Sequence, residues 1–135
     1  NKIIDGFFYI TNCHNEGAAF SLFSGNVLFL IFITLIVLFL IYRSINKENV
    51  NKIGILAYGL LLGGILGNLY DRIFYGYVID YLDFVIFKFN FAIFNLADAA
   101  IVIGAILLIV FEGSDNDGRK NKDRSRKLRK EWKNR

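Results

Sequence analysis

Two acidic residues lie in short polar motifs at the edges of long apolar segments. Asp80 follows Val78 and Ile79, and Asp98 ends the motif FNLAD 18 residues further along. If the chain returns to the same place over this interval, the two carboxyl groups meet, share a proton and titrate in two separated steps. The ionised acid can then activate water while the protonated acid donates to a carbonyl oxygen or a leaving amine. This pattern predicts peptide hydrolysis without a metal ion or a covalent intermediate.

Spacing alone leaves other roles open for these acids. Asp83 fits the same chemistry almost as well as Asp80. Asp80 is also compatible with a loop or capping carboxylate. Asp98 is compatible with a residue that caps a helix or pairs with Arg72.

The segment GNLYDR adds polar side chains to one predicted helix face. Asn68, Asp71 and Arg72 stand at positions i, i+3 and i+4, which are neighbours on a helix surface. Asn95 and Asp98 are three residues apart and share a face for the same reason. Before Asn68, glycines at every fourth position form a stripe where we expect another helix to pack closely: Gly59, Gly63 and Gly67.

Other site chemistries fit the sequence less well. Cys13 and His14 are adjacent, which is poor geometry for a nucleophile and its base. One Cys and one His do not make a zinc site, and no Gly-rich phosphate loop follows a predicted strand. A single Cys also excludes a disulfide within the chain. We therefore expect neither a metal ion nor a cofactor.

The motifs are carried by apolar runs long enough to cross a bilayer. The chain has 135 residues, of which 55% are hydrophobic, and residues 18–42 and 53–70 contain no charged side chain. A helix needs roughly 20 apolar residues to cross a hydrocarbon core of about 30 Å, and a helix satisfies its own backbone in lipid. We predict three membrane-spanning helices, near residues 22–42, 53–72 and 95–112, rather than a soluble domain.

Basic residues gather in two segments and predict the orientation. Residues 43–52 hold three of them, and the tail at 113–135 holds ten against four acidic residues. Both segments should face the cytoplasm, which leaves residues 1–20 and 73–93 outside. We expect the tail to be disordered and to lie near anionic lipid rather than to bind nucleic acid. An outer N-terminus and the lack of Met predict a further helix upstream.

The predicted fold class is an all-α membrane protein with short strands at its outer surface. Three transmembrane helices are visible in the sequence, and four are expected in the intact protein. Phe8 and Ile10 fit one face of a short strand, and Phe87, Phe89 and Phe91 alternate with polar residues as strands do. Residues 1–112 would form the membrane-embedded domain, and residues 113–135 the cytoplasmic tail.

Four motifs follow one another between these helices and carry a resemblance to a known family. They are NEGAAF at 15–20, GNLYDR at 67–72, VID at 78–80 and FNLAD at 94–98. In this order they resemble bacterial lipoprotein signal peptidase, also called signal peptidase II, over roughly residues 1–112. The family's first helix is missing here, and Tyr81 stands where the family more usually has Phe.

The resemblance implies a four-helix intramembrane aspartic peptidase with a small extracytoplasmic β-rich cradle. Such an enzyme lies in the bacterial cytoplasmic membrane, with its active site at the extracytoplasmic face, and is blocked by globomycin-type cyclic peptides. Its partners are membrane lipids and prolipoproteins, which it cleaves just before a Cys that carries diacylglycerol. By motif, Asp80 and Asp98 match the catalytic aspartates, which favours Asp80 over Asp83. Four residues match polar positions that hold substrate or orient the acids: Asn15, Asn68, Arg72 and Asn95.

Two functions of other classes use the same residues differently. A small transporter or channel would use Asp80, Asp98 and Arg72 as an ion or proton path, and it predicts acids spread through the membrane depth. A membrane scaffold would bind partners through its glycine stripe and basic tail. It predicts that both acids can be replaced by Asn without loss of function.

Overall fold

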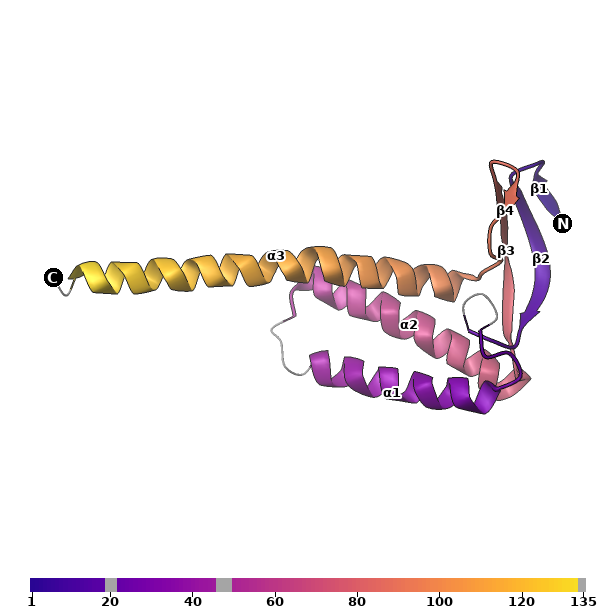
Figure 1. Ribbon diagram of the computed structural model, residues 1–135, viewed down its shortest axis with the longest axis horizontal. Coiled ribbons are helices and arrows are strands. Elements are labelled where there is room, and N and C mark those ends of the chain that lie inside the picture. Colours follow the sequence, from indigo (N-terminus) through magenta and orange to yellow (C-terminus); the bar gives the residue numbers. More distant parts are fainter. Residues whose placement is uncertain (19–21, 46–49, 134–135) are drawn as a thin grey trace.

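In its described residues the chain forms three helices and a small antiparallel sheet that lies across one end of them (Figure 1). The computed structural model describes residues 1–18, 22–45 and 50–133. In chain order the elements are β1 (Lys2–Ile4), β2 (Phe8–Asn15), α1 (Val27–Ile45), α2 (Lys52–Tyr75), β3 (Val78–Ile86), β4 (Phe89–Asn90) and α3 (Leu96–Lys133). The predicted helices with a small β-rich part are present. The fold class all-α is only partly confirmed, because four strands form a sheet in the order β1-β2-β3-β4.

The helices carry their apolar side chains on the outside. α1 and α2 are long and apolar enough to cross a membrane, and α3 contributes a shorter apolar part, Leu96–Val110. On α1 only Leu30 is buried among the described residues, whereas large side chains such as Leu28 and Phe32 are exposed. An apolar surface of this extent suits lipid and not water.

The two ends of α2 are fixed by local hydrogen bonds. At its start the side chain of Asn51 accepts from the backbone N–H of Gly54 at 2.8 Å, which is an N-cap. At its end Gly76 has φ +80°, and its N–H donates to the carbonyl of Arg72 at 3.2 Å. This left-handed cap lets the chain reverse at once into β3. The last turns of α2, with Asn68 and Arg72, therefore lie beside the strand that carries Asp80.

α2 and α3 approach each other through two glycines. A Cβ on Gly64 would come within 2.3 Å of the carbonyl oxygen of Ala97, and one on Gly104 within 2.7 Å of the carbonyl oxygen of Ala57. Of the predicted glycine stripe only Gly67 meets α3, where a Cβ would lie 3.5 Å from the Cβ of Ala97. Gly59 and Gly63 are exposed, and a Cβ on either would meet nothing within 4 Å. The closest approach of α3 is at Gly64, one residue after Gly63 and thus on a different face of α2.

The sheet differs from the predicted strands in its details. β2 and β3 pair antiparallel, with Cys13 opposite Asp80 and Asn15 opposite Val78. Phe87 and Lys88 do not belong to a strand. They form the two-residue turn of the β3–β4 hairpin, with φ of +51° and +68°. The predicted alternation from Phe87 to Phe91 is therefore confirmed only for Phe89–Asn90.

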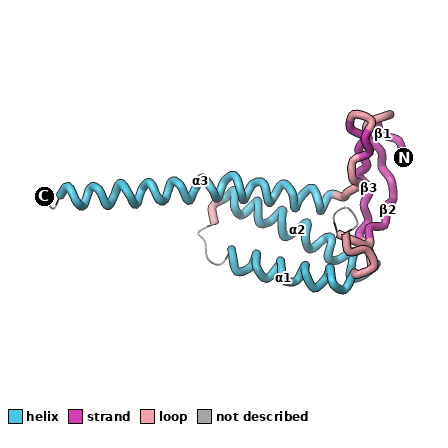
Figure 2. Tube along the Cα trace, in the orientation of Figure 1, coloured by secondary structure: helices cyan, strands magenta, loops and turns pink. Residues whose placement is uncertain are grey.

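α3 continues as a helix to Lys133, beyond the predicted end near residue 112 and through the segment expected to be disordered. It extends well past the other two helices on the side away from the sheet (Figure 2). The composition of the tail favours this long helix. The tail is rich in Lys and Arg, which favour helix, and it contains no Pro. The division into domains at residue 112 stays a prediction.

Replacing Gly64 and Gly63 separately tests this packing. We expect Gly64→Ala to lower the free energy of unfolding by about 1–3 kcal/mol, because the added methyl group forces α2 and α3 apart. Gly63→Ala adds the same methyl group in open space and should change stability by no more than about 1 kcal/mol, in either direction. Unfolding in mixed detergent micelles, followed by circular dichroism, measures both. Equal effects of the two variants would contradict this packing.

Candidate active site

Asp80 is a buried acid held by two asparagines. It is the third residue of β3, and only 2% of its surface is exposed. Its Oδ2 accepts from Nδ2 of Asn15 at 2.9 Å, and its Oδ1 accepts from Nδ2 of Asn95 at 2.9 Å. β2 and the segment before α3 therefore both fix its carboxyl group.

Asp98 lies in the first turn of α3 and takes part in a capping box. The side-chain oxygen of Asn95 accepts from the backbone N–H of Asp98 at 3.0 Å, and Oδ2 of Asp98 accepts from the backbone N–H of Asn95 at 3.1 Å. The reciprocal pair satisfies two donors that the helix start leaves free. The other oxygen of Asp98, Oδ1, accepts from Nδ2 of Asn68 at 2.7 Å.

Asn95 joins the two acids. Its Nδ2 donates to Asp80 and also to Oδ1 of Asn68 at 3.1 Å, while its backbone N–H donates to Asp98. Only 4% of its surface is exposed, so these bonds are shielded from water. The carboxyl groups of Asp80 and Asp98 are thus the two ends of one buried network, and a movement of either acid disturbs the other.

Arg72 holds a loop and not a carboxylate. Its Nη2 donates to the carbonyl of Gly17 at 2.8 Å, and its Nη1 donates to the carbonyl of Asn68 at 3.4 Å. An ion pair of Arg72 with Asp71 or Asp98 is absent, so the alternative that Asp98 pairs with Arg72 is wrong. Asp71 instead accepts from the backbone N–H of Ile79 at 3.2 Å, next to Asp80.

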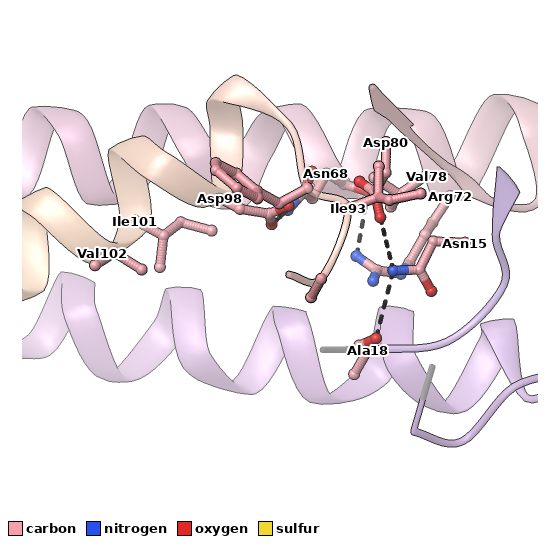
Figure 3. Close-up of a pocket in the computed structure, with 12 residues that line it drawn as sticks. Asn15, Ala18, Asn68, Arg72, Val78, Asp80, Ile93, Asp98, Ile101 and Val102 are labelled. Atoms are coloured by element: carbon pink, nitrogen blue, oxygen red, sulfur yellow. Dashed lines mark hydrogen bonds between the residues drawn. The ribbon is translucent and has the colours of Figure 1, made fainter. Parts of the chain in front are cut away.

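A cavity of about 270 Å³ opens in front of both acids (Figure 3). At its polar end lie Asn15, Arg72 and Asp80, whereas Ile101 and Val102 extend it along α3 with apolar side chains. The remaining wall is formed by residues after β2, on α2, at the start of β3, between β4 and α3, and in the first turn of α3: Ala18, Asn68, Val78, Ala92, Ile93, Phe94 and Asp98. The cavity can therefore receive a ligand that has a polar and an apolar part.

The environment of Asp80 favours its protonated form. Burial raises the pKa of Asp80 above its ordinary value of 3.8, and the charge of Asp98 raises it as well. The hydrogen bonds from Asn15 and Asn95 and the charge of Arg72 act in the opposite direction without reversing the shift. A carboxyl group in this state can serve as a proton donor.

The structure brings all six residues singled out in the sequence together. Five line the cavity, and Asn95 lies behind its wall. Asp83 is separated from them, because residues an odd number apart on a strand point to opposite faces, and it lines a second pocket with Tyr9 and Phe91. His14 stacks on Tyr77 on the sheet, at a ring distance of 4.0 Å, and is exposed.

Sequence reasoning missed several groups of the site. The carbonyl of Gly17 is the acceptor for Arg72, and Ile101 and Val102 form the apolar wall. A backbone carbonyl carries no signature in a sequence, and the two side chains look like any lipid-facing residues of α3. Among the residues that the structure describes, no group of three His, Cys, Asp or Glu side chains could hold a metal ion.

The sequence and the fold are similar to those of known proteins. Residues 1–112 match the family model described as signal peptidase (SPase) II. A lipoprotein signal peptidase of Staphylococcus aureus is 40% identical over 123 residues, covering 90% of this chain and 76% of the relative. One from Francisella tularensis subsp. novicida is 43% identical over 112 residues, covering 78% and 70%. A bacterial membrane enzyme structure solved by the in meso method superposes with a TM-score of 0.78 at 38% identity, covering 86% of this chain and 71% of that one.

The raised pKa of Asp80 predicts a stability difference that depends on pH. Between the ordinary pKa of 3.8 and the raised value, the folded chain keeps a proton that the unfolded chain has released. The wild type therefore loses stability as the pH rises through this window, whereas the amide in Asp80→Asn does not titrate. We expect the melting temperature of Asp80→Asn, relative to wild type, to rise from about pH 4 to about pH 7 in detergent. A difference that is constant or falls would contradict the raised pKa.

Proposed function

The chain belongs to the signal peptidase II family and removes signal peptides from prolipoproteins, and we propose that Asp80 and Asp98 are the two catalytic acids. The observation that carries this proposal is the buried network in which Asn95 connects both carboxyl groups at one cavity. Peptide hydrolysis by an aspartic pair needs two acids that face one substrate site, and both carboxyl groups line this cavity.

The surroundings of the acids support a division of roles. Asp80, whose pKa is raised by burial, would be the protonated acid that donates its proton to the scissile carbonyl oxygen as water attacks. Asp98 accepts two N–H donors in the first turn of α3, where the helix dipole favours negative charge. It would be the ionised base that takes a proton from the attacking water. When the C–N bond breaks, Asp98 passes this proton to the leaving amine, and Asp80 takes its proton back from the hydroxyl group of the tetrahedral intermediate, which restores the pair.

The cavity supports a substrate that carries a lipid. We propose that the signal peptide lies beside the helices and that its cleavage site enters the polar end, near Asn15 and Arg72. The Cys that follows the cleaved bond carries diacylglycerol, for which Ile101 and Val102 would form an apolar path into the bilayer. Val102 is 56% exposed, so this side of the cavity is open to surrounding lipid.

The placement of the basic tail supports an active site at the outer face of the cytoplasmic membrane. The C-terminal end of α3, which is rich in Lys and Arg, lies at the opposite end of the molecule from the sheet (Figure 1). With basic segments in the cytoplasm, the sheet and the acids lie outside. Globomycin-type cyclic peptides would bind in the same cavity and compete with the prolipoprotein.

A transporter is less well supported by the same geometry. A proton or ion path needs polar groups at several depths of the membrane. In the described part of the chain, Asp80, Asp98 and Arg72 instead gather at the end of the helices that carries the sheet.

Replacing each acid by its amide tests the catalytic proposal. We expect Asp80→Asn and Asp98→Asn each to lower the cleavage rate by roughly 10²–10⁴-fold, because each removes one proton-transfer group and keeps its size. The assay follows cleavage of a diacylglyceryl-modified prolipoprotein by the full chain in detergent-lipid micelles. Thermal unfolding of each variant shows whether the fold is retained.

Asp83→Asn is the matched control for these variants. It makes the same chemical change three residues from Asp80, but on the opposite face of β3 and in a different pocket. Its activity should be close to that of the wild type. Normal cleavage by both Asp80→Asn and Asp98→Asn, or equal loss in Asp83→Asn, would refute the assignment.

A further inference from the structure

The β3–β4 hairpin ends in a group of exposed apolar side chains that the catalytic proposal does not use. We define the hairpin tip as residues 86–89. Phe87 is 92% exposed and Phe89 is 78% exposed, and Lys88 lies between them at the turn. On β1, at the same end of the sheet, Ile3 and Ile4 are also more than half exposed.

The direction of the sheet places the hairpin tip beside the helix bundle. The strands run across the ends of the helices, and the end of the sheet with β1 and β4 projects past α3, away from α1 and α2 (Figure 1). If the helices cross the bilayer, the strands lie parallel to its surface. The hairpin tip then lies over lipid and not over the helices.

The two turn residues of the hairpin tip have a backbone conformation that is unfavourable for their large side chains. Phe87 and Lys88 have φ of +51° and +68°, a conformation that Gly, Asn or Asp adopts with less strain in two-residue hairpins. The sequence nevertheless has a large aromatic and a long basic residue there. Strain at these two positions points to a role for their side chains outside the turn itself.

We propose that the hairpin tip inserts into the interfacial layer of the bilayer and anchors the sheet at a fixed depth. Aromatic rings are favoured at the level of the lipid headgroups, and Lys88 can extend its ammonium group to lipid phosphates. A second copy of the chain fits less well, because a symmetric contact at the tip would bring two Lys88 side chains together.

The anchor has a consequence for the depth of the site. β3 carries the hairpin tip at one end and Asp80 near the other. Fixing the tip at the headgroup level therefore holds Asp80 close to the level at which a membrane-anchored peptide leaves the lipid.

Tryptophan fluorescence in liposomes tests the anchor without measuring activity. In a Trp132→Phe background, which removes the chain's one Trp, Phe87→Trp and Phe89→Trp each place a single reporter at the tip. We expect blue-shifted emission and severalfold stronger quenching by lipids brominated near the headgroup end of the acyl chain, because interfacial side chains lie about 5–10 Å into this boundary. Asn12→Trp is the control, since Asn12 is exposed on the face of β2 away from the site.

Each outcome decides the proposal. Quenching of both tip reporters well above that of Asn12→Trp supports insertion. Quenching equal to the control, with red-shifted emission, overturns it. Blue-shifted emission that resists brominated lipid and weakens when the protein is diluted in lipid also overturns it, because a second copy then covers the tip. Circular dichroism of every variant checks that the fold is retained.

Discussion

The hydrogen bonds of Asn95 are the interaction on which the site depends. Its side chain reaches Asp80 on the sheet, and its backbone N–H reaches Asp98 on α3. Charges are costly when buried unless hydrogen-bond partners replace water, and Asn95 supplies such partners to both acids. The same residue caps α3, so the start of the helix and the geometry of the acids are one feature. A change at this cap would alter the fold and the chemistry together.

The membrane explains why the rest of the molecule is built from long helices and close contacts. Apolar side chains gain no hydrophobic free energy from packing against one another when lipid is the alternative, so helices associate through close van der Waals contact and hydrogen bonds. α2 and α3 therefore rely on close backbone approach, at Gly64 and Gly104, which brings the last turns of α2 against the first turns of α3. Asn68 and Asp98 meet across this contact at 2.7 Å. Helix packing and acid positioning thus share one interface.

The polar end of the cavity combines segments that are far apart along the chain. Asn15 ends β2, Arg72 lies near the end of α2, and Asp80 lies on β3. Arg72 contributes by binding the carbonyl of Gly17, which ties the segment after β2 to α2. An arginine that holds a loop can place Asn15 against Asp80 without neutralising the acid.

The sequence by itself determined the apolar helices, the end of the molecule where polar groups gather, and the six residues around the cavity. Uncharged runs of bilayer length permit little other than helices, and the resemblance of the motifs favoured Asp80 over Asp83 where spacing left both open. β3 was not predicted, because VIDYLDFVI mixes polar and apolar residues on both faces of a half-buried strand. Its pairing with β2 and β4 makes it a strand.

Only the tertiary structure decided which groups touch. The face of α2 that packs against α3 contains Gly64 and not the regular stripe at Gly59 and Gly63, because contact depends on the direction from which the partner helix arrives. The partner of Arg72 is a backbone carbonyl, which every residue has and no sequence marks. α3 also continues to Lys133 through a charged segment whose composition is compatible both with disorder and with helix. The residue types determine the local chemistry, whereas the distances between the residues are determined only when the chain packs.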